Sequence, residues 1–179
     1  MTIRALARLV LFVAVICTPA YSADLILDNA PTKVLFSPKG GCAAAIVSEI
    51  RSAKSQILVQ AYSFTSVPIA KALVDAHKRG VKIEVILDKS QRAEKYTSAT
   101  FLANSGIPTY IDGHHALAHD KVMILDRAVV ITGSFNFTRA AEESNAENII
   151  FLRSEELTEL YEANWRRHKG HSEPYEARN

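Results

Sequence analysis

Two short apolar runs separated by a charged pair constrain the fold of this chain more than any other feature. Residues 122–125 and 128–131 are wholly apolar, and Asp126 and Arg127 separate them. Runs of this length with a polar break predict two buried strands joined by a tight turn. If the charged pair supplies the two central turn residues, the last residue of the first run pairs with the first residue of the second. The stretch is therefore predicted to be a β-hairpin.

The polar residues that flank this hairpin are predicted to meet at its open end. The shortest turn sets Lys121 opposite Thr132 and His119 opposite Ser134. Because side chains alternate along a strand, these four residues would share one face. Asp126 would lie in the turn, away from them, and we expect it to hold the hairpin rather than take part in chemistry.

A cluster of an imidazole, an ammonium group and hydroxyls suits a phosphodiester substrate. Lysine supplies a positive charge, and hydroxyl and amide groups donate to the non-bridging oxygens. Histidine can attack phosphorus or move a proton near neutral pH. This chemistry needs no metal ion.

The same residues carry a resemblance to a known family. The pattern HxKxxxxD followed by GSxN resembles the motif of the phospholipase D superfamily, and the brevity of the chain resembles the small, secreted, single-motif bacterial endonucleases of that superfamily. The residues that match the motif are His119, Lys121, Asp126, Gly133, Ser134 and Asn136. The resemblance implies catalysis by His119, Lys121, Ser134 and Asn136, with Asp126 and Gly133 as structural parts of the motif and no cofactor.

An acidic residue after the motif completes the implied site. In the resembling nucleases such a residue accepts from the catalytic imidazole and fixes its tautomer, and Glu147 is the best match here. The alternative, that Glu147 is a solvated residue of a polar loop, remains open. Glu142 and Glu143 are predicted to be solvated residues of that kind.

The first 23 residues are predicted to be a cleaved signal peptide. Arg4 and Arg8 precede an apolar stretch too short to span a membrane, and Ala20-Tyr21-Ser22 offers a cleavage site. One domain, residues 24–179, would remain, in the periplasm or outside the cell. The formal net charge of +2 comes from the two arginines that are removed, so binding of nucleic acid must rest on a local basic patch.

The remaining chain alternates strands and helices. Apolar periodicity and helix start and stop signals predict these elements. Strands are expected near residues 33–36, 56–63, 81–87, 108–111 and 148–152, and helices near residues 41–53, 66–79, 91–104 and 154–168. The order predicts an α/β fold with a mixed β-sheet flanked by helices on both faces, an α-β-α sandwich. Cys42 is expected to be buried on a helix, and the tail from Gly170 to be loose.

Other polar residues are weaker candidates. Lys89, Arg92 and Arg139 could contact a phosphate backbone, although a solvated helix face explains each one. Their role therefore remains open.

The loop histidines allow a second interpretation. His114 and His115 are expected in a loop near the site, where they could touch substrate. His115 and His119 lie four apart and could hold zinc on a helix, but Gly113 and the strand that follows argue against a helix. No metal site is predicted.

These observations favour a metal-independent phosphodiesterase, and within that class a non-specific DNA endonuclease. A phosphohistidine mechanism needs two histidines on one phosphorus, and the motif occurs once, so the resemblance implies a homodimer with a shared site. Cleavage of RNA as well remains open. The alternatives are hydrolysis of phospholipid headgroups and, from another class, a catalytically idle nucleic-acid-binding module. Intact His119 and Lys121 argue against the idle module.

Overall fold

The computed structural model describes residues 22–94 and 96–176 of the 179-residue chain. Within these residues an eight-stranded sheet has the order β1-β7-β6-β5-β2-β3-β4-β8. Its strands are β1 (Thr32–Ser37), β2 (Gln56–Ala61), β3 (Lys82–Asp88), β4 (Thr109–Asp112), β5 (Lys121–Leu125), β6 (Val129–Gly133), β7 (Glu147–Arg153) and β8 (Glu173–Pro174). The helices are α1 (Cys42–Ser52), α2 (Val67–Lys78), the 3₁₀ turn η1 (Lys89–Arg92), α3 (Ala99–Asn104), α4 (Arg139–Glu143) and α5 (Glu155–His171).

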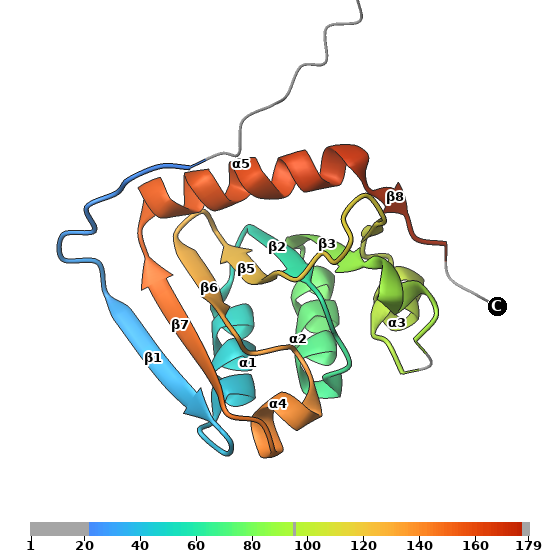
Figure 1. The fold of residues 1–179 in the computed structure, drawn as a ribbon, viewed down its shortest axis with the longest axis horizontal. Helices are drawn as coiled ribbons and strands as arrows, with labels where there is room; N and C mark the ends of the chain where they lie inside the picture. The colour runs from blue at the N-terminus through green and yellow to red at the C-terminus, as the bar shows by residue number, and fades with distance from the viewer. Residues whose placement is uncertain (1–21, 95, 177–179) are drawn as a thin grey trace, which may run out of the picture.

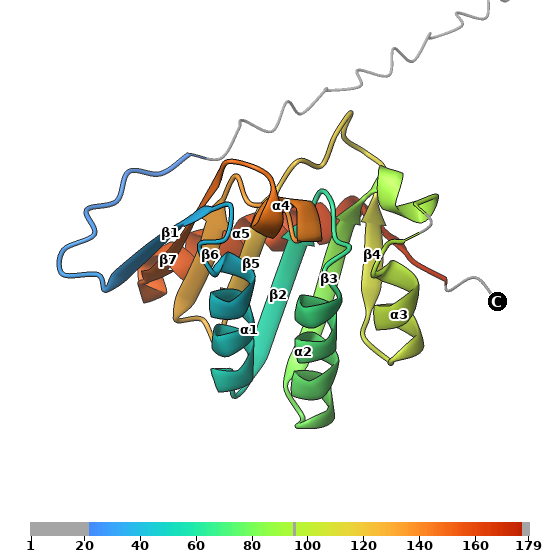
Figure 2. The same ribbon diagram turned by 90° about the horizontal axis from the view of Figure 1, so that it is seen from below.

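The sheet is mixed and is covered on both faces. Strands β2, β3 and β4 run parallel, whereas β5, β6, β7 and β1 pair antiparallel. Helices α1 and α2 cover one face and α5 crosses the other (Figures 1 and 2). This architecture confirms the predicted α/β sandwich.

Burial on both faces explains why the sequences of the central strands are continuous apolar runs. Alternate residues of β2 and β5, such as Val59 and Met123, join the large core beneath α1 and α2. Their neighbours Leu58 and Ile124 join a smaller cluster around Trp165 of α5. The Trp165 indole nitrogen donates to the Val59 carbonyl oxygen at 2.9 Å, which ties α5 to the middle of the sheet. A strand buried on both sides has no polar face to show in its sequence.

Two predicted elements differ from the structure. The helix expected over residues 91–104 is broken into η1 and α3, because the buried Gln91 side chain accepts from the Phe64 backbone nitrogen (3.2 Å) and from the Thr97 hydroxyl (3.1 Å). The expectation of a loose tail was wrong for the described part. Residues 173–174 form β8 beside β4, and Tyr175 is buried with its hydroxyl 2.8 Å from that of Thr100.

Three further expectations concern the signal peptide, Cys42 and membrane spans. The predicted signal peptide lies almost entirely outside the described residues, so it stays a prediction. Cys42 is fully buried at the beginning of α1, as expected. Within the described residues, no helix combines the length and apolarity needed to cross a bilayer.

Candidate active site

The β5–β6 hairpin is present, but its register differs from the predicted one by one residue. Leu125 pairs with Val129, not with Ala128. Asp126 and Arg127 have positive φ angles of 53° and 56°, and the Ala128 nitrogen closes the turn on the Leu125 carbonyl oxygen at 2.9 Å. The Ala128 carbonyl oxygen instead accepts from the Ser154 nitrogen at the start of α5 (3.1 Å). Ala128 is thereby taken out of the strand pairing.

This shift changes which residues lie opposite the catalytic strand. Extended outward, the observed register sets Lys121 opposite Gly133 instead of Thr132. By alternation Thr132 then faces the α5 side of the sheet, whereas Lys121 lies on the side of α1 and α2. The prediction that Thr132 and Ser134 directly oppose Lys121 and His119 was therefore wrong. Ser134 is held by Asn148 of β7 instead.

His119 and Lys121 lie together at the end of the sheet where β2 ends and β5 begins. Ala61 of β2 pairs with Lys121. The Lys121 ammonium group donates to the His119 carbonyl oxygen at 2.8 Å and lies 4.9 Å from the centre of the Tyr62 ring. The same ring lies 4.5 Å from the His119 imidazole. Tyr62 thus packs against both motif residues, a contact that the sequence pattern did not reveal.

Exposure separates the roles of these two side chains. His119 is exposed, whereas Lys121 is only 7% exposed. Burial lowers the pKa of Lys121, and the negative charges of Asp120, Glu147 and Asp88 act in the opposite direction. An accessible nucleophile over a desolvated cation is an arrangement that can stabilise negative charge on a substrate.

Gly133 and Ser134 are held against the start of β7. Gly133 has a φ of 150°, and a Cβ there would lie 2.3 Å from the Asn148 carbonyl oxygen, so this position requires glycine. That carbonyl oxygen accepts from the nitrogens of Ser134 (3.1 Å) and Phe135 (3.2 Å). The Ser134 hydroxyl oxygen accepts from the Asn148 nitrogen at 3.1 Å. Its own proton remains free to donate to a phosphoryl oxygen. Asn148 therefore positions Ser134, a role that the sequence did not signal.

Asn136 is fixed by its buried neighbours and keeps an unused acceptor. Phe135 and Phe137 are both 1% exposed, and the Phe137 carbonyl oxygen accepts from the nitrogens of Thr65 and Ser66. The Asn136 side-chain oxygen is buried and has no hydrogen-bond partner among the described residues. A buried acceptor without a donor is costly. A donor from bound substrate or a second subunit would satisfy it.

Glu147 lies close to the ammonium group of Lys121. Its charge acts on the pKa of Lys121, and its carboxylate accepts from the Asn145 amide at 3.1 Å. Among the described residues no hydrogen bond joins it to His119. The proposed orienting role of Glu147 stays a prediction.

Glu142 is not the solvated residue that the sequence suggested. Its carboxylate accepts from the backbone nitrogens of Gly41 (2.9 Å) and Ala43 (2.7 Å). It therefore caps the first turn of α1 from a segment a hundred residues away. Glu143 is exposed and pairs with Arg139 at 2.7 Å.

Asp126 lies at the far end of the hairpin and serves the fold. Its carboxylate accepts from the nitrogens of Lys54, Ser55 and Gln56 at 2.8–3.0 Å, and from the Ser55 hydroxyl at 2.8 Å. Burial would raise the pKa of Asp126, but these hydrogen bonds outweigh it and hold the pKa below its usual value. The carboxylate thus ties the hairpin turn to the start of β2.

The three weaker cationic candidates make contacts elsewhere. Arg92 pairs with Glu173 at 2.8 Å, and Arg139 pairs with Glu143 as described. The Lys89 ammonium group donates to the His115 carbonyl oxygen at 3.0 Å. Exposed ion pairs are weak and can exchange for a phosphate. Contact of these cations with substrate stays a prediction.

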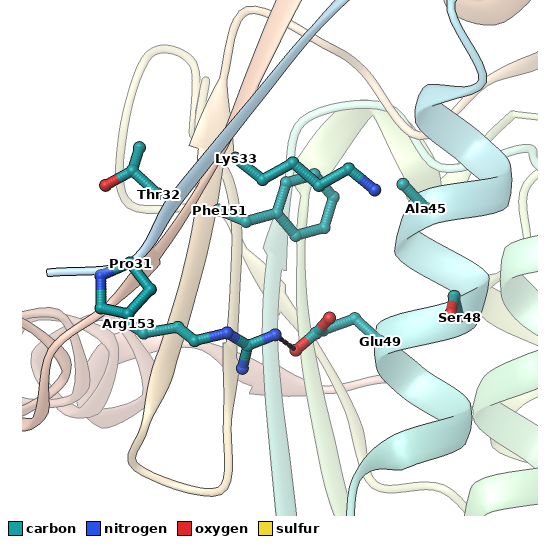
Figure 3. Close-up of a pocket in the computed structure, with 8 residues that line it drawn as sticks. All are labelled: Pro31, Thr32, Lys33, Ala45, Ser48, Glu49, Phe151 and Arg153. Carbon is teal, nitrogen blue, oxygen red and sulfur yellow. Dashed lines mark hydrogen bonds and ion pairs between the residues drawn. The ribbon is translucent and has the colours of Figure 1, made fainter.

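A pocket on another part of the surface does not carry this chemistry. It lies beside β1, β7 and α1 (Figure 3). An ion pair between Arg153 and Glu49 closes one side at 2.6 Å, and Lys33 and Phe151 line another. The lining includes none of the motif residues. The open sheet end around His119 is the better candidate for the active site.

Comparisons with known proteins show similarity over most of the chain. The family model described as "Cardiolipin synthase, PLD-like domain" matches residues 46–169. A phospholipase D of Rickettsia conorii is 40% identical over 139 residues, which cover 78% of this chain and 70% of that protein.

Two solved structures are similar over most of the described chain. Nuc from Salmonella typhimurium, described as a phospholipase D family member, is 38% identical with a TM-score of 0.79, covering 82% of this chain and 98% of that one. NucT from Helicobacter pylori has the same fold at 20% identity, with a TM-score of 0.76 and coverage of 82% and 99%.

Proposed function

Because this chain belongs to the phospholipase D superfamily and is a phosphodiesterase, we propose that it is a DNA endonuclease with little sequence preference. The observation that carries the proposal is the exposed His119 imidazole beside the buried Lys121 ammonium group. The chemical step uses no metal ion, since the ammonium group and neutral donors supply the charge stabilisation. From the predicted signal peptide we further propose that the protein acts in the periplasm or outside the cell.

The proposed reaction has two steps. A His119 ring nitrogen attacks phosphorus, forming a P–N bond as the P–O bond to the leaving group breaks. A second, protonated imidazole gives its proton to the leaving oxygen. That imidazole then removes a proton from water, whose oxygen attacks phosphorus and releases His119. The two steps return both histidines to their starting states.

The second imidazole comes from another copy of the chain in this proposal. The motif occurs once, so a twofold axis through the site would set one His119 on each side of the phosphorus. Lys121 and the donors of Ser134 and Asn136 from both subunits would hold the non-bridging oxygens as charge develops.

Phospholipid hydrolysis is the rival within the same chemistry. It is favoured by the name of the Rickettsia relative, which the chain matches over 70% of its length. DNA is favoured by the extent of the match to Nuc, of which 98% is covered. The longest loop between the described strands and helices is residues 113–120. A loop of this size offers little surface for insertion into a bilayer.

A paired assay tests the proposal. Mature protein is incubated with supercoiled plasmid and, separately, with phosphatidylcholine vesicles, both in EDTA at 25 °C, with circular dichroism to confirm the fold. We expect plasmid nicking and no choline release. His119→Asn should lower nicking on the order of 10³-fold or more while DNA binding persists.

Three results would overturn parts of this proposal. Choline release without nicking would assign the site to phospholipids. Loss of nicking in EDTA that magnesium restores, while the fold stays intact, would show that a metal takes part in the chemistry. Binding of DNA by the unmodified protein without cleavage of either substrate would identify an idle binding module.

A further inference from the structure

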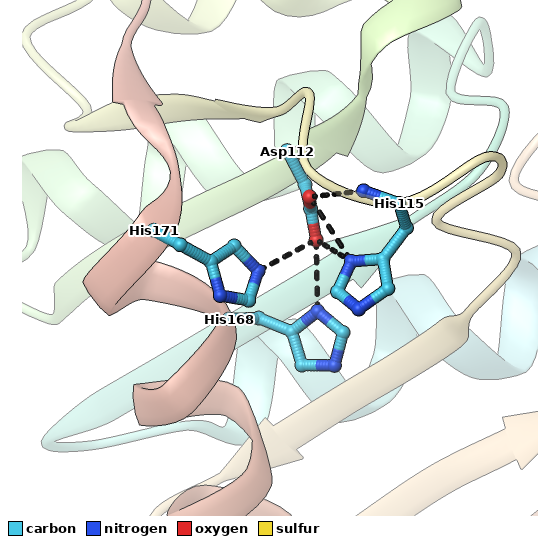
Figure 4. A group of neighbouring side chains, drawn as sticks. All are labelled: Asp112, His115, His168 and His171. Atoms are coloured by element: carbon cyan, nitrogen blue, oxygen red, sulfur yellow. Dashed lines mark hydrogen bonds and ion pairs between the residues drawn. The ribbon is translucent and has the colours of Figure 1, made fainter. Parts of the chain in front are cut away.

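Four of the six histidines of the chain, a group that does not include His119, gather around one buried carboxylate. Asp112 ends β4 and is fully buried. Its Oδ2 lies 2.8 Å from His168 Nδ1, 3.0 Å from His115 Nδ1 and 3.3 Å from His171 Nε2. Figure 4 shows the three rings converging on this carboxylate from the loop after β4 and from the last turn of α5. His114 packs on the outside of the group, 4.8 Å from the His171 ring.

Hydrogen bonding alone accounts poorly for this cluster. A carboxylate oxygen offers about two lone-pair sites, yet three ring nitrogens face the Oδ2 of Asp112. Asp112 Oδ1 already accepts from the His114 nitrogen at 3.0 Å. Each ring nitrogen could donate as a neutral tautomer, but the three rings and the His114 nitrogen would still compete for the lone pairs of one carboxylate. One cation bound between the four groups removes that conflict.

The donor set and its spacing fit a tetrahedral zinc ion. The four ligand atoms all lie within 4.8 Å of one another. Zinc binds imidazole nitrogen and carboxylate oxygen at 2.0–2.2 Å, which sets the ligands of a tetrahedron about 3.4 Å apart. The distances from Asp112 Oδ2 to the three ring nitrogens, 2.8–3.3 Å, are all slightly shorter than that value, so small rotations of the rings suffice. We propose that Asp112, His115, His168 and His171 form a zinc site.

The surroundings of the four residues also favour a cation. His171 is the last residue of α5, and the C-terminal end of a helix carries partial negative charge. The hydrogen bond from the His114 nitrogen fixes the second oxygen of Asp112, as metal-bound carboxylates are commonly held. The Lys89 contact with the His115 carbonyl oxygen holds the loop in place. These contacts hold the proposed ligands in place within the chain itself.

Four protein ligands leave no open position, so the site is structural. It would fasten α5 to the loop of residues 113–120, which contains His119 and leads into Lys121. Zinc would thereby limit how far the nucleophile can move without touching the phosphorus. This role is separate from the proposed reaction, which needs no metal in its chemical step.

The positions of the four residues in the sequence explain why the pattern of histidines did not indicate this group. His115 and His119 attracted attention because they lie four apart, but the loop between them is not helical. The ligands form two short pairs, Asp112 with His115 and His168 with His171, which are separated by more than fifty residues. Only the docking of α5 on the sheet brings the two pairs together.

Zinc binding can be measured without reference to activity. Protein without a polyhistidine tag is stripped with a chelator and titrated with Zn²⁺, and with Co²⁺ to report geometry by visible absorption. We expect one equivalent of tightly bound metal per chain and the intense absorption of tetrahedral Co²⁺. His171→Asn should weaken zinc binding at least tenfold, whereas His77→Asn, which removes a histidine of α2, should leave it unchanged.

Zinc binding by variants of the two sites tests the zinc proposal independently of the proposed nuclease activity. His119→Asn should bind zinc as the unmodified protein does, whether or not the chain cleaves DNA. Zinc should also raise the thermal midpoint of the unmodified protein but not that of folded His171→Asn. Failure of the unmodified protein to bind zinc, or equal binding by His171→Asn, would show that the cluster is only a hydrogen-bonded network.

Discussion

His119 and Asp126 belong to one sequence motif but lie at opposite ends of the β5–β6 hairpin. His119 is exposed at the open end, beside Lys121 and Tyr62. Asp126 lies in the turn, where its carboxylate accepts four hydrogen bonds from the residues that begin β2. The motif therefore combines a candidate catalytic residue, His119, with a structural residue, Asp126, that fixes the hairpin turn.

The role of Asp126 predicts a stability defect rather than a chemical one. Asp126→Asn replaces a charged acceptor of several backbone N–H groups, so we expect the free energy of unfolding to fall by about 1–3 kcal/mol. Nicking activity at a temperature where the variant is folded should stay within a few-fold of the unmodified protein. Urea unfolding and the plasmid assay measure the two effects. A well-folded but inactive Asp126→Asn would refute the assignment.

The same carboxylate predicts a pH dependence. Its pKa is lowered in the folded protein, so folding favours the charged form. The resulting stabilisation is complete above the unfolded pKa of about 4 and is lost as pH falls through the folded value. The stability difference between the unmodified protein and Asp126→Asn should therefore shrink below about pH 4. A difference that stays constant down to pH 2 would contradict this explanation.

Sequence reasoning at this scale found the motif residues but missed those that support them. The spacing identifies His119, Lys121, Ser134 and Asn136 directly. Tyr62 and Asn148 carry no such pattern, because their roles arise from pairing between strands distant in the sequence. The hairpin register was missed because the bond from Ser154 to Ala128 is a tertiary contact.

At the scale of elements, α4 links the motif to the beginning of α1. Thr138 caps α4 by accepting from the Ala141 nitrogen at 3.1 Å. Glu142 then reaches the first turn of α1. The segment that follows Asn136 is thus fixed to a helix that lies about a hundred residues earlier in the sequence.

A pair of neighbouring glutamates tests this link. Glu142→Ala removes the acceptor from two N–H groups of α1 and should cost about 1–2 kcal/mol of unfolding free energy. Glu143→Ala removes only an exposed pair with Arg139 and should cost about 0.5 kcal/mol or less. Chemical denaturation of both variants gives the comparison. Equal effects would show that the Glu142 contacts contribute no more than a surface ion pair.

The elements that sequence predicted well are those with long, regular patterns. The core strands and helices α1, α2 and α5 were expected within a few residues of their observed limits. The short elements α4 and β8 were not expected, since five- and two-residue segments are too brief to show a period. The break before α3 was hidden because the contacts of Gln91 are tertiary.

At the scale of the whole molecule, the proposed reaction requires two chains. A symmetric homodimer should bury on the order of 1,600 Å² or more in total around the site. Sedimentation should show a dimer at working concentrations, and specific activity should fall once dilution produces monomer. A monomer with full specific activity would refute the shared site.

Mixed dimers provide a second check of the shared site. His119→Asn and Lys121→Ala subunits, mixed and allowed to exchange, should recover little activity, because the single site at the twofold axis lacks one group from each side. Two independent sites in each dimer would also give no recovery, but unmodified subunits mixed with His119→Asn would then keep half of their activity per dimer. A shared site predicts almost no activity in the mixed dimer, so an equal mixture should keep only the activity of the roughly one quarter of dimers that are fully unmodified.

The pairing of β1 with β7 makes the site a late product of chain synthesis. The Ser37 hydroxyl donates to the Asn145 carbonyl oxygen across 108 residues, and β7 supplies Glu147 and the Asn148 that holds Ser134. Long-range closure of this kind is slow and forms near the end of folding. A chain that stops before residue 147 therefore contains His119 and Lys121 but lacks the Asn148 that holds Ser134, and we expect it to have no activity.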